Sequence, residues 1–144
     1  MKLNRKGCTR LVIELKRVVI KIPNFTYSWH HFIKGIDGNM DEWQTWVYNG
    51  YDAEKRALRD RLLCPVLWHS WGGWIVVMRK ANTLTFDEWE LLDYDISEHK
   101  KYFAGDDSMS NYGFINEKLV KIDYASLDKY WGEDFKIPKY NHPP

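Results

Sequence analysis

Short apolar runs separated by turn residues dominate the first part of the chain. Residues 11–15 (LVIEL) and 18–22 (VVIKI) are rich in β-branched side chains, and Lys16 and Arg17 lie between them. Two such runs joined by a short polar break are typical of a β-hairpin. Pro23 has no N–H to donate to a sheet, so we expect it to end the second strand.

The apolar spacing becomes helical beyond Gly38. Trp43, Trp46 and Val47 follow an i, i+3, i+4 pattern, which places them on one face of a helix. Asn39 precedes them and Glu42 stands three residues after it. Because Asn is a favourable N-cap residue, the pattern predicts a helix that begins at Asn39.

A second helix and a second hairpin are predicted next. Asp52 is a good N-cap before a helical stretch, and Pro65 lies just beyond the expected end of that helix. Residues 65–70 (PVLWHS) and 74–78 (WIVVM) flank a Gly-Gly pair, which predicts a hairpin. His69 in this hairpin is interpreted as a solvated turn residue rather than a metal ligand.

The last elements are a short helix and a third hairpin. Thr85 with Glu88 three residues later is a capping-box pattern, and it predicts a helix that places Trp89, Leu92 and Ile96 on one face. Residues 118–122 (KLVKI) are predicted to form a strand of the third hairpin. Hairpins mixed with helices in this order predict an α+β protein.

Composition narrows the class of protein. The chain has 144 residues, 44% of them hydrophobic and eight of them Trp, which suits one folded domain with a core. The net charge of +1 gives no reason to expect a nucleic-acid or membrane partner. Two Cys residues far apart and the lack of any apolar run near the ~20 residues of a membrane span favour a cytoplasmic protein.

Oxygen-bearing side chains gather around the third hairpin. Asp106 and Asn111 precede the predicted strand, and Asp123 follows it. Carboxylate and amide oxygens are suited to Mg²⁺, which takes one or two carboxylates and completes its shell with phosphates and water. The alternative is an Asx-rich turn of Asp106, Asp107 and Asn111 that binds no ligand. If Asp123 is buried, it needs a partner such as a metal ion or Lys21.

Five segments, in order, resemble the protein-kinase-like fold. Residues 18–21 (VVIK) resemble the strand that carries the phosphate-binding Lys, and Glu42 matches the helix Glu that pairs with it. Residues 74–81 (WIVVMRKA) resemble the fifth strand and the hinge. Residues 106–111 have the D-x-x-x-x-N spacing of the catalytic loop, and 122–125 (IDYA) stand where kinases carry DFG.

The resemblance covers about residues 10 to 127. It is closest to the small divergent kinase-like proteins that bacteriophages carry and to the aminoglycoside-phosphotransferase branch of the fold. It implies a minimal two-lobed domain over residues 1–144, with an N-lobe of about 1–80 and a reduced, truncated C-lobe of about 81–144. For a phage-encoded protein the expected location is the host cytoplasm.

The resemblance also implies ATP and Mg²⁺ as cofactors and gives each candidate residue a role. Asp106 would be the catalytic base, and Asn111 and Asp123 would bind the metal. The nucleotide would be held by residues from the strand, the helix and the hinge, namely Val19, Lys21, Glu42, Met78, Arg79, Lys80 and Ala81.

The motifs depart from the kinase pattern in ways that favour a second hypothesis. No G-x-G-x-x-G precedes Lys21, Ala104-Gly105 replaces the His-Arg pair before Asp106, and Ala125 replaces the Gly of DFG. The alternative function is therefore a catalytically inactive pseudokinase that docks on a host protein and modulates it, with Trp side chains as anchors.

Purely structural interpretations of two site residues remain open from sequence. Lys21 can be a charged residue that protects an edge strand from aggregation. Glu42 can be a capping-box partner of Asn39 with no further role.

Overall fold

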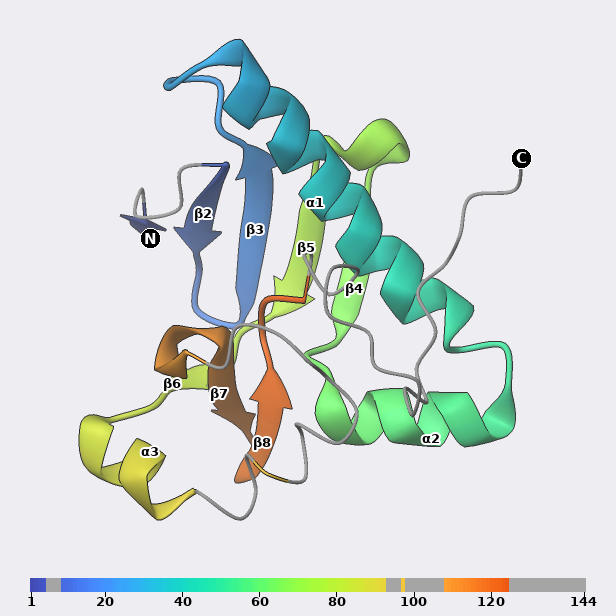
Figure 1. Cartoon of the computed structure of the whole chain (residues 1–144), viewed down its shortest axis with the longest axis vertical. Helices are drawn as coiled ribbons and strands as arrows, with labels where there is room; N and C mark the ends of the chain where they lie inside the picture. Colours follow the sequence, from blue (N-terminus) through green and yellow to red (C-terminus); the bar gives the residue numbers. More distant parts are fainter. Residues whose placement is uncertain (5–8, 93–96, 98–107, 125–144) are drawn as a thin grey trace.

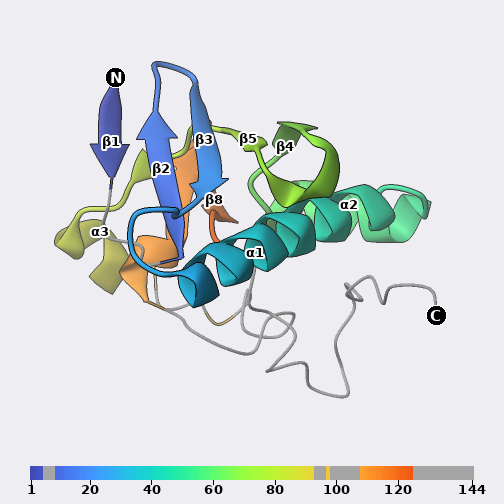
Figure 2. The same ribbon diagram turned by 90° about the horizontal axis from the view of Figure 1, so that it is seen from above.

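The computed structural model of the chain describes residues 1–4, 9–92, 97 and 108–124. Within these residues the protein is mixed α/β, with three α-helices and two antiparallel sheets (Figure 1). Seen from above, α1 lies across one face of the larger sheet (Figure 2). The architecture is consistent with the predicted α+β class.

The larger sheet has five strands in the order β1-β2-β3-β5-β4. The strands are β1 (Lys2–Asn4), β2 (Arg10–Glu14), β3 (Val18–Pro23), β4 (Val66–His69) and β5 (Val76–Arg79). The first two predicted hairpins are confirmed as β2–β3 and β4–β5, and β3 ends at Pro23 as expected. β1 was missed by the sequence analysis.

The register of β2, β3 and β5 brings the candidate residues Val19, Lys21 and Met78 onto one face of the larger sheet. Lys21 lies opposite Val12 of β2, and Val19 lies opposite Met78 of β5. Side chains alternate between the two faces along a strand, so Arg10 shares the face of Val12. This face of the sheet carries both apolar side chains and fixed positive charge.

Helix α1 (Trp29–Tyr48) begins far earlier than predicted. The N-cap is Ser28, whose hydroxyl accepts a hydrogen bond from the backbone N–H of His31. Asn39 lies in the middle of the helix and is fully buried, so the prediction of a helix start at Asn39 was wrong. Its amide donates to the carbonyls of Lys21 and Gly73, at 3.1 and 2.9 Å.

Gly35 allows α1 to lie directly against the sheet. A Cβ atom at this position would overlap the carbonyl oxygen of Thr9 and come within 2.9 Å of the Pro23 Cα. The absence of a side chain therefore sets the distance of α1 from β2 and β3. That distance determines where Glu42, two turns further along α1, meets the sheet.

The remaining elements follow α1 along the chain. They are α2 (Ala53–Leu62), the 3₁₀ turns η1 (Trp71–Gly73) and η2 (Met109–Asn111), α3 (Phe86–Leu91), and a second sheet of β6 (Asn82–Thr83), β7 (Tyr112–Ile115) and β8 (Lys118–Lys121) in the order β6-β7-β8. None of the helices in the described part of the chain is long and apolar enough to cross a membrane.

Three predictions about these elements are confirmed. Asp52 caps α2, Thr85 and Glu88 form the capping box of α3, and residues 118–121 form the strand β8. Ile96, expected on the same face as Trp89, lies outside the described residues.

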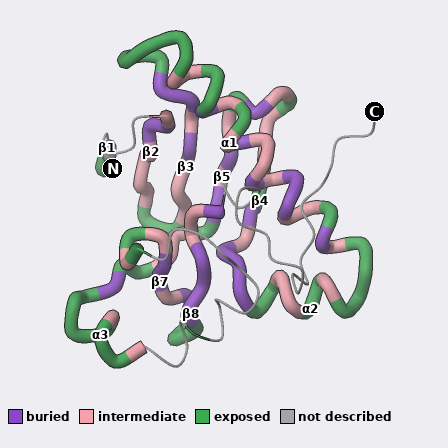
Figure 3. The backbone as a smooth tube through the Cα atoms, in the orientation of Figure 1, coloured by how far each residue is buried: buried purple, intermediate pink, exposed green. Residues whose placement is uncertain are grey.

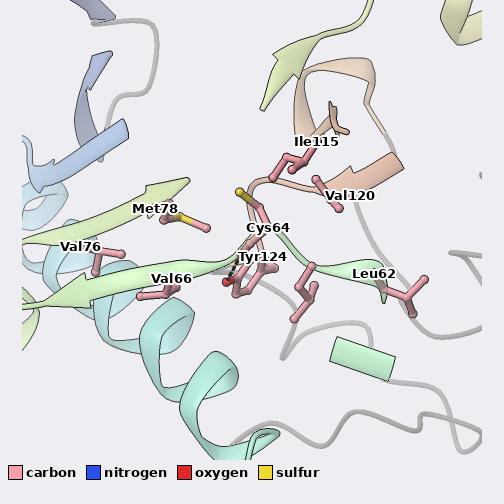
Figure 4. Close-up of a cluster of buried hydrophobic side chains, with 9 residues drawn as sticks. Leu62, Cys64, Val66, Val76, Met78, Ile115, Val120 and Tyr124 are labelled. Atoms are coloured by element: carbon pink, nitrogen blue, oxygen red, sulfur yellow. Dashed lines mark hydrogen bonds between the residues drawn. The ribbon is translucent and has the colours of Figure 1, made fainter. Parts of the chain in front are cut away.

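One hydrophobic core joins the two sheets. Its buried members come from α2, β4, β5, β7 and β8 and from the segments after α2 and β8 (Figure 4): Leu62, Leu63, Cys64, Val66, Val76, Met78, Ile115, Val120 and Tyr124. The hydroxyl of Tyr124 donates to the Cys64 carbonyl at 3.0 Å. Three of the four residues of β8 and alternate residues of β5 are buried, whereas β3 is mostly of intermediate burial (Figure 3).

We predict that Gly35→Ala destabilises the protein by about 1–3 kcal/mol, because the added methyl group overlaps backbone atoms that cannot move away. At an unconstrained helix position the same substitution would stabilise by about 1 kcal/mol, since Ala is the better helix former. The measurement is the free energy of unfolding in urea, followed by Trp fluorescence. The control is Lys34→Ala at an exposed position of the same helix, whose free energy of unfolding is expected to stay within about 0.5 kcal/mol of wild type. An increase in stability for Gly35→Ala would contradict the close approach.

Candidate functional site

A pocket of about 540 Å³ opens where the larger sheet meets the start of the second sheet and the end of β8. It is lined by Val12, Glu14, Val19, Lys21, Cys64, Met78, Arg79, Lys80, Ala81, Thr83, Ser110, Asn111, Ile122 and Asp123. Every candidate residue that the structure describes lies in this lining except Glu42. The volume falls within the range of about 300–1,000 Å³ that is typical of small-molecule sites.

Lys21 and Glu42 form the buried ion pair that the sequence predicted. The Lys21 Nζ donates to both oxygens of the Glu42 carboxylate, at 2.8 and 3.0 Å, and to the carbonyl oxygen of Ile122 at 2.9 Å. An ammonium group has three N–H donors, and here three acceptors surround it. Lys21 therefore connects β3, helix α1 and the segment that follows β8.

The edge-strand interpretation of Lys21 and the capping-box interpretation of Glu42 were both wrong. β3 is the central strand of the larger sheet, so Lys21 does not protect an edge. Glu42 is fully buried inside α1 and does not cap a helix start at Asn39. Burying a carboxylate without a partner is costly, so its cationic neighbours explain why it is tolerated there.

Arg10 is a site residue that the sequence analysis missed. Its guanidinium bridges two carboxylates: Nη1 lies 2.8 Å from Glu42 Oε2, and Nη2 lies 2.8 Å from Asp123 Oδ1. Asp123 was expected, if buried, to pair with a metal or with Lys21, and the structure pairs it with Arg10. The alternation of Arg10, Val12 and Glu14 along β2 was the available signal, because it puts all three on the Lys21 face.

The guanidinium of Arg10 is held firmly. Burial lowers its pKa, but the nearby Glu42 and Asp123 carboxylates outweigh that effect and raise the pKa above its ordinary value. Nη1 also reaches the Asn39 side-chain oxygen at 3.5 Å. Arg10 is 7% exposed, whereas the Asp123 side chain is 46% exposed. The ion pair thus joins a buried cation to a carboxylate that reaches the pocket.

Asn111 lies beside Asp123 because of a backbone contact. The N–H of Ile122 donates to the Asn111 carbonyl at 2.8 Å, which places the residue after Ile122 next to the 3₁₀ turn η2. Both proposed metal ligands therefore line the same part of the pocket. Among the described residues, no group of three or more His, Cys, Asp or Glu side chains is arranged to hold a metal ion.

The backbone of the expected hinge is partly engaged by the protein itself. The N–H of Arg79 donates to the Pro65 carbonyl at 3.0 Å, and the N–H of Lys80 donates to the Arg17 carbonyl at 2.9 Å. The thiol of Cys64 donates to the Arg79 carbonyl at 3.0 Å. These two N–H groups are therefore already engaged within the protein.

Two further residues near the site can be placed in the structure, and one candidate cannot. Cys64 lines the pocket, and burial raises the pKa of its thiol to about 12, so the thiol is neutral at pH 7 and a weak nucleophile. Asp106, the expected catalytic base, lies outside the described residues. His69 stacks on Trp43 with ring centroids 4.2 Å apart, so it packs against α1 rather than standing as a solvated turn residue.

Comparisons with known proteins gave no relative: no family model matches the chain, and neither a curated protein nor a solved structure matches it.

We predict that Glu42→Gln destabilises the protein by about 3–5 kcal/mol, because it leaves Arg10 and Lys21 buried without their shared carboxylate. The matched control is Glu14→Gln, which breaks the half-exposed pair with Lys80 (3.4 Å) and is expected to cost less than about 1 kcal/mol. Urea unfolding measures both variants. A cost for Glu42→Gln as small as that for Glu14→Gln would show that the buried pairs do not stabilise the fold.

Proposed function

We propose that the protein is a minimal kinase-like protein that binds ATP with Mg²⁺ in this pocket and transfers the terminal phosphoryl group to an acceptor. One observation carries the proposal. Segments from strands β3 and β5, the chain after β5, the turn η2 and the end of β8 converge on one pocket, with the Lys21–Glu42 ion pair at its wall. These segments are the ones that resemble kinase motifs in sequence order.

The apolar part of the pocket suits a nucleobase. Val19 and Met78 are cross-strand neighbours in the lining, and Val12 and Ile122 extend the apolar surface. Because the Arg79 and Lys80 N–H groups are already bonded, packing rather than backbone hydrogen bonds would hold most of the base. This supports a site where shape and apolar contact count for more than base-edge recognition.

The polar part of the pocket suits a triphosphate with Mg²⁺. Lys21 supplies a fixed positive charge for phosphate oxygens, and Asp123 and Asn111 supply one carboxylate and one amide oxygen. Mg²⁺ takes one or two carboxylates and obtains its other ligands from phosphates and water, so this donor set fits the ion. When bound, the metal would neutralise charge on the phosphates.

Phosphate binding would require Lys21 to exchange a partner. Its three hydrogen-bond donors already point to Glu42 and to the Ile122 carbonyl. The acceptor at Ile122 is a neutral carbonyl, so this hydrogen bond is weaker than the two bonds to the Glu42 carboxylate. It is therefore the bond that we expect to break. A phosphate oxygen would take the place of this carbonyl while the pair with Glu42 persists.

The two sheets support a division into two lobes. The last strand of the larger sheet ends at Arg79 and the second sheet begins at Asn82, which agrees with lobes of about 1–80 and 81–144. Asp106 would accept the proton of the acceptor hydroxyl. Phosphoryl transfer asks the protein mainly for positioning and charge neutralisation, which the remaining site residues supply.

We predict that Val19→Trp abolishes ATP binding without unfolding the protein, because the indole would fill the apolar part of the pocket. The matched control is Ile20→Trp, one residue along β3 and on the opposite face of the sheet. Calorimetry with ATP and Mg²⁺ measures both, and circular dichroism checks the fold. Unchanged affinity in folded Val19→Trp would place the nucleotide elsewhere.

A second function, docking on a partner protein without catalysis, is favoured by a surface of exposed aromatic side chains. This aromatic surface consists of Phe25 and Tyr27 before α1, Trp29 at its first position, and Trp71 and Trp74 in and just after η1. Trp71 is 87% exposed. Phe32 connects the two parts of this surface, because its ring stacks on Trp29 and its ring centroid lies 5.6 Å from that of Trp74. Exposed aromatic clusters of this kind mark interaction sites.

We predict that Asp106→Ala retains Mg·ATP but loses phosphoryl transfer, whereas Asp123→Ala loses the Mg²⁺ dependence of nucleotide binding. A positioned base contributes typically ~10²–10⁴-fold to a rate, while metal ligands act already in the bound state. The assay follows label from the γ-phosphate of ATP into the protein itself and into a host-cell extract. Equal labelling in wild type and Asp106→Ala would remove Asp106 from the mechanism. Bound Mg·ATP with no labelling in either would favour the docking function.

A further inference from the structure

We infer that Arg10 prevents the carboxylates of this site from holding a divalent cation on their own, so that the metal enters only together with a polyphosphate. The inference rests on the proposed function and assigns to it a positioning residue outside the pocket lining. Arg10 reaches Asp123 from the β2 side, while Asp123 faces the pocket.

The four charges of the ion-pair network behind the pocket cancel in the absence of ligand. Arg10 and Lys21 carry two positive charges, and Glu42 and Asp123 carry two negative charges, joined by three ion pairs of 2.8 Å each. A divalent cation binding alone would add two positive charges beside a guanidinium and an ammonium with little solvent around them. That addition is unfavourable because charges interact strongly where water is excluded.

A polyphosphate reverses this balance. ATP brings several negative charges, so the metal and the phosphates together leave the site with no excess of positive charge. Asp123 can also meet a metal while its pair with Arg10 persists, because its side chain is 46% exposed and lines the pocket. The metal and the nucleotide then each strengthen the binding of the other, as linkage requires.

Arg10 cannot easily move away to make room for a metal alone. Its Nη1 pairs with Glu42, which is fully buried, and Arg10 itself is only 7% exposed. Releasing Asp123 would leave part of a buried guanidinium without its acceptor, which is costly. The described residues also contain no cluster of three acidic, His or Cys side chains that would offset the repulsion.

The test measures Mn²⁺ binding, with electron paramagnetic resonance of free Mn²⁺ as the readout. Three binding steps are compared in the wild type: Mn²⁺ alone, ATP with a chelator, and preformed Mn·ATP. We expect ATP to tighten Mn²⁺ binding by at least about tenfold relative to the protein without nucleotide, a coupling in the usual range. Wild-type protein that binds Mn²⁺ equally well without ATP would overturn the inference.

The variant arm removes the charge of Arg10. Arg10→Gln is expected to tighten the binding of Mn²⁺ alone by at least about fivefold and to lower the coupling to ATP by the same factor. Arg17→Gln, the same chemical change at an exposed position in the β2–β3 turn, is the control and should match the wild type. Arg10→Lys keeps the positive charge and should keep Mn²⁺ binding weak in the absence of ATP.

The outcomes separate the two proposals. Folded Arg10→Gln that binds Mn²⁺ alone no better than wild type would overturn the role of Arg10 while leaving nucleotide binding intact. If Arg10→Gln does not fold, the wild-type comparison and Arg10→Lys still decide. ATP that fails to bind with or without metal would overturn the proposed function, and the inference with it.

Discussion

The buried carboxylate of Glu42 is the group on which the rest of the site depends. It receives Lys21 from β3 and Arg10 from β2, and the backbone N–H of Tyr124 lies 3.4 Å from Oε1. A desolvated carboxylate requires such partners. Each of them belongs to a different segment, so meeting this one requirement fixes helix α1, the sheet and the end of β8 relative to one another. The pocket lies between the sheet and the segment after β8, which this arrangement holds in place.

The elements that the sequence predicted well are those whose signals are local. Runs rich in β-branched residues predicted the first hairpin of the larger sheet, and apolar runs around a Gly-Gly pair predicted the second. Asp52 and Thr85 marked helix starts through contacts within one turn. Helix α1 was misplaced because Asn39, which follows Gly38, was interpreted as an N-cap. In the fold Asn39 serves distant contacts instead, because its amide bonds the carbonyls of Lys21 and Gly73, and Gly35 earlier in the same helix admits the backbone of Thr9.

The candidate site could be predicted in part for the same reason. Lys21, Glu42, Asn111 and Asp123 carry recognisable residue types at recognisable spacings, and the structure brings them together. Arg10 could not be assigned, because its role depends on which two carboxylates the fold places beside it. The occupied N–H groups of Arg79 and Lys80 depend likewise on where Pro65 and Arg17 lie, which no local pattern encodes.

The pair between Arg10 and Asp123 joins positions 113 residues apart. Closing so long a loop costs entropy before the contact repays it, and folds rich in distant contacts form slowly. During synthesis from the amino end, Arg10, Lys21 and Glu42 emerge from the ribosome well before their last partners. The β2–β3 hairpin and α1 can form early, whereas the pocket has to wait until almost the whole described chain has been made. A chain interrupted before β8 would therefore expose charged side chains that the finished protein keeps from water.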